Sequence, residues 1–244
     1  MFFSIITVSL NAENLIADTI NSALSQTFTD FEIVVKDGGS KDNTLNNVPK
    51  DERIRIIEKS DKGIYEGMNQ AIKEAKGKYL IFMNCGDLFY DNSVLESAYE
   101  RLADEDPCIL YGNVYGELLG LIKSPEVIKK SRFYYSTICH QAAFIHKDLF
   151  DTFGYYDEKM KIAADWKFFL DAFIGGTRYT YLDKVICRYL GGGVSESEKG
   201  LLLCKKEKAP ILKERFSFSE RVCYKLANTR FGRFLLKAKS KRKK

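Results

Sequence analysis

The chain contains 244 residues, of which 45% are hydrophobic and 29% are charged. This composition is that of a folded globular protein, and it excludes a disordered or fibrous chain. No apolar run reaches the roughly 18–20 residues that a membrane-spanning helix needs. The six cysteines are scattered singly, without a Cys-x-x-Cys pair. This usage indicates reduced thiols in a cytosolic protein rather than a disulfide framework or a zinc site.

The net charge of +5 is unevenly distributed along the chain. Residues 221–244 hold ten basic side chains and no acidic one, so subtracting these ten from the total leaves −5 for residues 1–220. An acidic body argues against nucleic acid as a partner. The basic end predicts binding to an anionic lipid surface, with a merely solvated tail as the alternative.

Residues 1–105 alternate between strand and helix patterns. Apolar residues recur at helical spacing in three segments, 13–25, 65–75 and 93–102. Ser93 and Glu96 open the last of these with the spacing of a capping box. Four apolar runs have the length of strands and hardly alternate with polar residues: 2–8, 31–35, 54–57 and 79–83. Such strands are typical of a parallel sheet covered by helices on both faces, which predicts an α/β fold.

The second half of the chain is less regular. Helical spacing begins at Asp165 and continues through Trp166, Phe169 and Phe173. Strands are expected on either side of a turn at Gly112-Asn113 and at three later places, namely 108–111, 114–122, 141–145, 178–182 and 185–190. Near the end, Phe231, Phe234 and Leu235 would share one face of a helix surrounded by cations, a pattern typical of a helix lying in a membrane interface.

Polar residues follow three of the expected strands at the point where each strand ends. These exits are Ser9-Leu10-Asn11, Asp37-Gly38-Gly39 and Asn84-Cys85-Gly86-Asp87. Because the carboxyl ends of parallel strands meet at one edge of a sheet, we expect a single shared site there.

Two aspartates in these exits could carry chemistry. Asp37 could accept a hydrogen bond from a ribose hydroxyl or a base N–H, or it could only shape an Asx turn. Neither a G-x-G-x-x-G fingerprint nor a P-loop is present. Asp87 is the one carboxylate of its loop, and a lone carboxylate together with substrate phosphates can hold Mg²⁺ or Mn²⁺. The alternative for Asp87 is a plain turn residue.

Asp165 and the two histidines are further candidates. Asp165 could be a general base at the mouth of a pocket or the N-cap of its helix, and the two roles are compatible. His140 and His146 are too few for a histidine metal site. We expect His140 to be structural, with a metal or phosphate ligand as the alternative.

Segments 7–13, 32–44, 61–69 and 77–87, followed by His140-Gln141-Ala142, Phe153 to Glu158 and Ala164-Asp165-Trp166, together resemble the family 2 glycosyltransferases. The resemblance extends from about residue 3 to 195 and is strongest to the bacterial polysaccharide-assembly branch. It implies a GT-A fold with a Rossmann-like nucleotide-sugar-binding half at residues 1–105. An acceptor-binding half at 106–200 would continue the same sheet, and a basic helical tail would occupy 201–244.

The resemblance also assigns roles to individual residues. Asp165 falls on the catalytic base, and Asp87 on the ligand for Mn²⁺ or Mg²⁺. The positions near the nucleotide sugar are Ser9, Glu13, Asp37, Asp61, Lys62 and Asn84. Two positions depart from the family pattern. Asn84-Cys85 stands where the D-x-D motif begins with acidic residues, and Ala164 stands where many relatives have a glutamate.

The implied activity is an inverting transfer of a sugar from a nucleoside diphosphate donor, expected to be a UDP-sugar. The acceptor would be a hydroxyl of a glycan or a lipid-linked molecule in surface polysaccharide synthesis. The enzyme would be cytoplasmic, and its basic tail would bind the inner face of the membrane. Two alternatives stay open, a binding subunit without catalysis and a nucleotidyltransferase that makes nucleotide sugars. The latter would need glycine and arginine in the first loop, and Ser9 to Glu13 contains neither.

Overall fold

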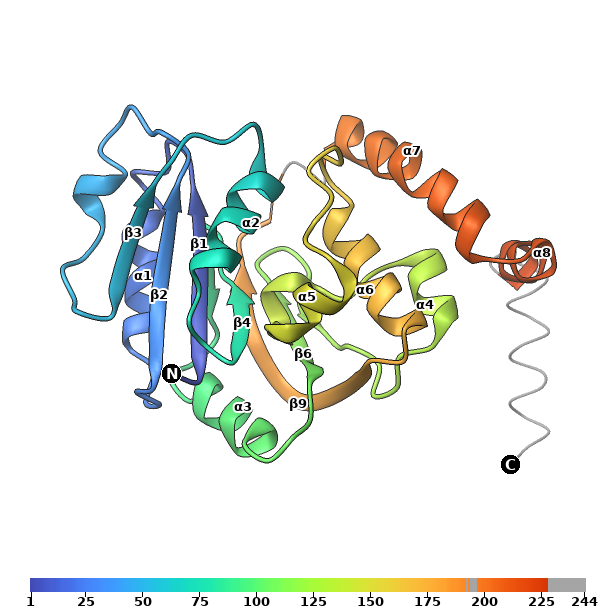
Figure 1. The fold of residues 1–244 in the computed structure, drawn as a ribbon, viewed down its shortest axis with the longest axis horizontal. Helices are drawn as coiled ribbons and strands as arrows, with labels where there is room; N and C mark the ends of the chain where they lie inside the picture. Colours follow the sequence, from blue (N-terminus) through green and yellow to red (C-terminus); the bar gives the residue numbers. More distant parts are fainter. Residues whose placement is uncertain (192, 194–196, 228–244) are drawn as a thin grey trace.

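The computed structural model describes residues 1–191, 193 and 197–227. In this described part of the chain, nine strands form one sheet in the order β3-β2-β1-β4-β8-β6-β9-β5, with β7 paired to β6 (Figure 1). The strands are β1 (Phe3–Ser9), β2 (Phe31–Asp37), β3 (Ile54–Glu58), β4 (Tyr79–Phe82), β5 (Asp87–Phe89), β6 (Cys108–Gly116), β7 (Gly120–Ile122), β8 (Ala143–His146) and β9 (Arg178–Tyr189).

Eight α-helices and two short 3₁₀ turns connect the strands within the described part of the chain. The helices are α1 (Ile16–Leu24), α2 (Ile64–Glu74), α3 (Val94–Leu102), α4 (Lys130–Tyr135), α5 (Asp148–Phe153), α6 (Ala164–Ile174), α7 (Glu198–Arg215) and α8 (Phe218–Ala227). The 3₁₀ turns are η1 (Leu45–Asn47) and η2 (His140–Ala142).

The first four strands are parallel, as predicted. Ser9 at the end of β1 pairs with Asp37 at the end of β2, and β4 lies on the other side of β1. The loops after β1, β2 and β4 therefore leave the same edge of the sheet. The sheet continues through β8, which is antiparallel to both β4 and β6, and β6 and β9 run parallel again. The predicted α/β fold with a mainly parallel sheet is confirmed.

Two apolar layers cover the two faces of the sheet. Successive side chains of β1 point to opposite faces of the sheet, and Ile6 lies in the layer that contains Met68 of α2 and Trp166 of α6. Phe3 and Ile5 point to the opposite layer, which α1 and α3 complete. Burial on both faces explains why β1 and β2 are apolar almost throughout, since neither face of these strands meets water.

Two of the predicted breaks between strands are absent from the structure, and at the first of them a bulge takes the place of the predicted turn. Gly112-Asn113 lies inside the continuous strand β6, which bulges between Tyr111 and Asn113 against β9. A Cβ at Gly112 would lie 2.6 Å from Ile186 Cγ1, so this glycine permits the close approach of β9. β9 is likewise one strand from Arg178 to Tyr189 and not two.

Three smaller predictions are also wrong. Ser93 does not cap α3 with its side chain: its hydroxyl donates to Asp91 Oδ1, and Glu96 accepts from Thr27 Oγ1. Gln141 belongs to η2, so the strand begins only at Ala143. Residues 13–15 form a turn, and α1 begins at Ile16.

The last two helices lie at the periphery of the fold (Figure 1). α8 packs on α4 through Tyr224 and Tyr134, and Lys130 of α4 forms an ion pair with Glu220 at 3.0 Å. Among the residues that the structure describes, no helix is long and apolar enough to cross a membrane. The predicted amphipathic segment around Phe231 and the basic end of the tail lie outside the described residues.

Candidate functional site

Asp37 is fully engaged by its own loop. Its Oδ1 accepts from the backbone N–H groups of Gly39 and Ser40 at 2.8 and 2.7 Å, and its Oδ2 accepts from the hydroxyls of Ser40 and Ser9 at 2.6 and 3.0 Å. Burial opposes its ionisation, but these hydrogen bonds outweigh burial and hold the pKa of Asp37 below its ordinary value. The predicted pair Ser9 and Asp37 is therefore brought together, in the Asx-turn arrangement named as the alternative.

The loops after β1 and β2 are locked to each other. Asn11, in the left-handed region at φ 50°, donates its N–H to Ser40 Oγ at 2.8 Å. Glu13 Oε2 accepts from the N–H of Asn43 at 2.9 Å. Because both loops are cross-linked by short polar contacts, they form a stiff wall at this edge of the sheet, and Glu13 is part of it.

Asp61 is bound to a buried lysine. Lys36 has no exposed surface, and its Nζ lies 2.6 Å from Asp61 Oδ2. A Cβ at Gly38 or Gly67 would come within 2.9 or 3.1 Å of that oxygen, so the carboxylate enters between two glycines. Lys62 follows with an exposed side chain. Lys36 is not among the residues predicted from the sequence, although a lysine inside an apolar strand is a signal that could have identified it.

The loop after β4 presents Asn84 and Asp87. Gly86, at φ 98°, donates its N–H to Thr19 Oγ1 and turns the chain so that Asp87 begins β5. Asp87 is 7% exposed, and its Oδ1 accepts a long hydrogen bond of 3.4 Å from Gln141 Nε2. Burial raises the pKa of Asp87 to about 6, although the charge of His140 acts to lower it.

A divalent cation fits Asp87 as one ligand. A desolvated carboxylate whose side-chain hydrogen bond is long is stabilised by a cation, and Mg²⁺ and Mn²⁺ take few protein ligands when substrate phosphates supply the others. Within the described residues, no group of three His, Cys, Asp or Glu side chains could hold a metal. Asp87 would thus depend on oxygen ligands from a bound donor.

Asp165 lies in the first turn of α6, and the N-cap position belongs to Ala163. Its Oδ1 accepts from the N–H of Trp166 at 2.8 Å and lies 3.0 Å from the Tyr65 hydroxyl. Its Oδ2 lies 3.2 Å from His140 Nδ1. Burial opposes ionisation, but the hydrogen bond and the charge of His140 outweigh burial and lower the pKa of Asp165. The carboxylate is therefore ionised at neutral pH.

His140 belongs to the site rather than to the core alone. Besides Asp165, its ring reaches the loop after β4, where Nε2 lies 3.3 Å from Asn84 Nδ2. The sequence analysis expected a structural histidine. The contact with Asp165 could not be inferred locally, because it joins η2 to α6 through the folded core.

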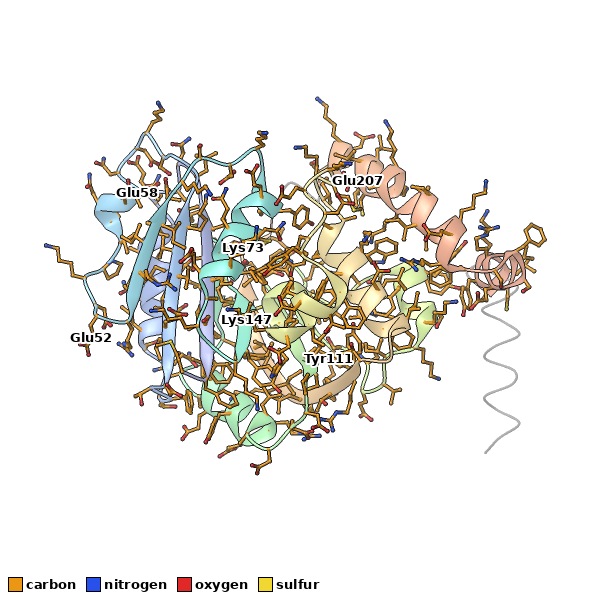
Figure 2. The ribbon with its side chains drawn as sticks, viewed as in Figure 1. Glu52, Glu58, Lys73, Tyr111, Lys147 and Glu207 are labelled. Carbon is orange, nitrogen blue, oxygen red and sulfur yellow. The ribbon has the colours of Figure 1, made fainter. Side chains whose placement is uncertain are left out.

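Two further residues hold the turn that carries Asp165. The Tyr65 hydroxyl lies 2.7 Å from the carbonyl oxygen of Ile162. Glu207 of α7, seen beside this turn in Figure 2, accepts from the N–H groups of Lys161, Ile162 and Ala163 at 2.7, 3.1 and 3.0 Å. α7 thereby fixes the start of α6. Nothing in the sequence around Tyr65 or Glu207 indicates this role.

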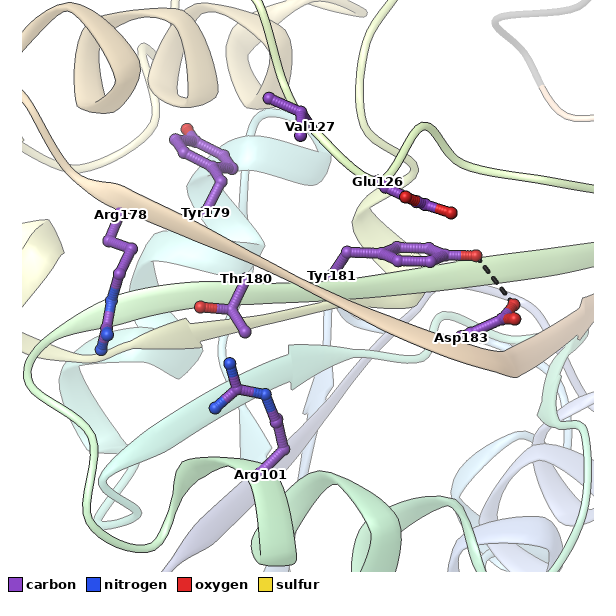
Figure 3. Close-up of a pocket in the computed structure, with 8 residues that line it drawn as sticks. All are labelled: Arg101, Glu126, Val127, Arg178, Tyr179, Thr180, Tyr181 and Asp183. Atoms are coloured by element: carbon purple, nitrogen blue, oxygen red, sulfur yellow. Dashed lines mark hydrogen bonds between the residues drawn. The ribbon is translucent and has the colours of Figure 1, made fainter.

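An open pocket of about 590 Å³ lies away from these residues, between α3, the 126–127 segment and the first half of β9 (Figure 3). Arg101 and Arg178 lie on one side, and Tyr181 donates to Asp183 at 2.9 Å on the other. None of its lining residues is a predicted site residue.

The sequence model described as Glycosyl transferase family 2 matches residues 4–160 of the chain. A PGL/p-HBAD biosynthesis glycosyltransferase of Mycobacterium tuberculosis is 32% identical over 203 residues, which cover 80% of this chain and 79% of that protein. An uncharacterized glycosyltransferase of the same species is 30% identical over 227 residues and covers 89% and 86% of the two chains.

Solved structures share the fold. Staphylococcus aureus TarS superposes with a TM-score of 0.69 at 20% identity, covering 95% of this chain and 45% of TarS, so the chain spans less than half the length of that protein. TarS 1–349 in complex with UDP-GlcNAc gives a TM-score of 0.68 at 21% identity and covers 97% and 76%. The mannosyltransferase PcManGT from Pyrobaculum calidifontis, in complex with GDP-Man and Mn²⁺, gives 0.59 at 17% identity and covers 76% and 56%. These likenesses confirm the predicted GT-A fold.

Proposed function

The chain belongs to glycosyl transferase family 2, and on that premise we propose that it transfers a sugar from a UDP-sugar to a hydroxyl of a glycan or lipid-linked acceptor, with inversion at the anomeric carbon. The observation that carries this proposal is the carboxylate of Asp165. It is ionised, held by three neighbours and bridged by His140 to the loop that contains Asn84.

Asp165 is the proposed general base. A sugar hydroxyl is a poor nucleophile at neutral pH, so a positioned carboxylate must take its proton during the attack. Oδ1 is occupied by Tyr65 and Trp166, whereas among the described residues Oδ2 contacts only His140, which leaves Oδ2 to accept from the incoming hydroxyl. Direct displacement from the side opposite the leaving group inverts the anomeric centre and needs no carboxylate nucleophile.

Asp87 is the proposed ligand of Mn²⁺ or Mg²⁺. When bound, such an ion stabilises as a Lewis acid the negative charge that develops on the leaving diphosphate. Asn84, Asp37, Ser9, Glu13, Asp61 and Lys62 are proposed to surround the nucleotide sugar. The shared edge of the loops after β1, β2 and β4 supports this assignment.

The choice of a UDP-sugar is supported by the TarS complex with UDP-GlcNAc, while the complex of PcManGT with GDP-Man shows that the same fold also accepts a guanine nucleotide. The test is a panel of UDP- and GDP-sugars with Mn²⁺, in which release of the nucleoside diphosphate is measured.

The matched pair for this test is Asp165→Asn and Glu214→Gln. Asn keeps the acceptor oxygen for the N–H of Trp166 but cannot take a proton, so turnover is expected to fall by about 10²–10⁴-fold. Glu214 is 68% exposed on α7, and its amide variant is expected to match the wild type. Full transfer by Asp165→Asn would contradict the proposal.

The alternatives give different results in the same assays. Retained donor binding with no turnover of any donor would favour a binding subunit without catalysis. A larger rise in melting temperature with a nucleoside triphosphate than with a UDP-sugar would favour a nucleotidyltransferase.

We further propose that the enzyme acts at the cytoplasmic face of the membrane. Tyr134, Leu212, Phe218 and Val222 line a groove of about 400 Å³ between α7 and α8, and Lys213, Arg221 and Lys225 lie around it. An apolar surface with a cationic rim suits an anionic bilayer, where each cation contributes on the order of 1 kcal/mol.

Co-sedimentation with vesicles that contain anionic lipid tests this partner. The full chain should bind more strongly than a chain ending at Ala227 or at Glu220, and salt should weaken the binding. Equal binding of all three chains, or binding by none, would refute the role of the tail.

A further inference from the structure

His140 connects two parts of the site that come from distant segments of the chain. Its Nδ1 lies 3.2 Å from Asp165 Oδ2 in α6, and its Nε2 lies 3.3 Å from Asn84 Nδ2 in the loop after β4. The imidazole ring is thus the direct link between the proposed base and the proposed donor loop.

The contacts of the ring indicate where it carries a proton. Nδ1 faces Asp165 Oδ2, and a carboxylate oxygen only accepts, so Nδ1 carries a proton and donates it to Asp165. On the opposite side of the ring, Nε2 contacts Nδ2 of the Asn84 amide, whose Oδ1 is buried without a hydrogen-bond partner among the described residues.

The charges around the ring favour a proton on Nδ1. Asp165 contacts it from α6, Cys139 precedes it in the chain, and the charge of Asp87 in β5 acts on it from further away. Burial alone would lower the pKa of His140, but the hydrogen bond and charge of Asp165, with smaller contributions from Cys139 and Asp87, raise it to about 9.

We propose that His140 is a positioning residue whose imidazole ring spans Asp165 and Asn84 and thereby fixes the proton acceptor relative to the donor loop. The inference rests on the proposed function, because it takes Asp165 as the base. With Nδ1–H on Oδ2, the carboxylate cannot rotate, and its remaining lone pair keeps one direction. With Nε2 on the Asn84 amide, that direction is tied to the loop that ends in Asp87.

A purely structural ion pair would have a different character. Replacing a buried ion pair with apolar side chains often costs no stability, so stability alone does not explain such a pair. Here the side chains of His140 and Asp165 keep 22% and 14% of their surface exposed, so a bound molecule can reach the pair.

The first experiment measures the protonation of the ring in the full chain without ligands. The sequence contains two histidines, so a ¹⁵N spectrum of the imidazole nitrogens shows two rings, and His146→Asn assigns them. Near neutral pH, Nδ1 of His140 should carry a proton. An unprotonated Nδ1 at neutral pH would overturn the inference.

The second experiment separates positioning from binding. His140→Asn and His140→Gln each keep one neutral N–H donor but cannot span both partners. Each should lower kcat by about tenfold to a hundredfold, since a misplacement of about 1 Å costs about 10²-fold, and should leave the KM of the donor within about twofold. His146→Asn is the matched control and should retain wild-type kcat. Wild-type kcat in both His140 variants would refute the role.

A double variant shows whether His140 acts through Asp165. If it does, His140→Asn in the Asp165→Asn background should cost little beyond the single Asp165→Asn loss. Losses that multiply would contradict a positioning role. If Asp165→Asn retains full transfer, the proposed function of Asp165 fails and the inference fails with it. If Asp165→Asn is inactive but Nδ1 of His140 carries no proton, only the inference fails.

Discussion

The ion pair between Lys36 and Asp61 should be one of the most sensitive points of the fold. Lys36 Nζ is completely buried and lies 2.6 Å from Asp61 Oδ2, whose side chain is 12% exposed. Removing one partner of a buried pair costs about 3–5 kcal/mol, because the other charge remains without compensation. Nζ retains the carbonyl oxygen of Asp37 at 3.0 Å, so Asp61→Asn should cost about 3 kcal/mol, at the lower end of that range.

Urea unfolding and calorimetry measure this cost directly. For a chain of this size, 1 kcal/mol corresponds to about 2–4 °C, so the melting temperature should fall by about 6–12 °C. Asn keeps Oδ1 for the N–H of Gly63, which confines the change to the charge. Glu74→Gln is the control: Glu74 is 58% exposed in its pair with Arg55, and its loss should cost at most about 1 kcal/mol.

The double variant Lys36→Met with Asp61→Asn decides the reasoning. Replacing both charges removes the uncompensated one, so the double variant should regain at least half of the stability that Asp61→Asn loses. If the double variant loses the sum of the two single losses, or if Asp61→Asn costs no more than Glu74→Gln, the buried charge is not what makes this position sensitive.

Three other predictions follow from single sites. The pKa of His140 is raised to about 9, which corresponds to a contribution of about 3 kcal/mol from its protonated form to the free energy of unfolding. This contribution is complete below the unfolded pKa near 6.5 and is lost as the pH rises through 9. Urea unfolding across this range should show the loss in the wild type and not in His140→Asn. Gly77→Ala should destabilise the fold by about 3 kcal/mol in the same assay, because the added Cβ would lie 2.4 Å from the backbone N of Ser4. Gly39→Ala should cost about 1–2 kcal/mol, because the space around Gly39 is open but its φ is 100°. In the wild type, Mn²⁺ and UDP together should raise the melting temperature. Asp87→Ala should abolish this rise and lower turnover by about 10²-fold or more, and an unchanged response to Mn²⁺ would show that Asp87 is not the ligand.

The edge of the sheet where the site lies could be predicted because its signals are local. Strands buried on both faces are apolar throughout, and each polar exit follows its strand directly, so Ser9, Asp37 and Asn84 were placed at one edge from the sequence. The resemblance to a family then added Asp165, which lies far from these loops in the chain. The α/β fold and the GT-A architecture needed no further information.

The remainder depended on contacts between distant segments. Nothing near His140 in the sequence indicates that Asp165 lies 3.2 Å away, and nothing near Glu207 indicates that it accepts three backbone N–H groups before α6. The bulge at Gly112 was taken for a turn because Gly-Asn favours both, and only the packing of Ile186 on that glycine distinguishes them. Local patterns predict elements, whereas the pairing of polar side chains depends on the assembled core.

The asparagine at position 84 is consistent with the charges around it. His140 already interacts with the charges of Asp165 and Asp87, and an acidic residue at position 84 would place a third negative charge against the same ring. That charge would draw the ring toward the donor loop and weaken its hold on Asp165 Oδ2. The amide of Asn84 contacts Nε2 without adding a charge. The same substitution that leaves Asp87 as the one acidic residue of its loop therefore keeps the ring paired with Asp165.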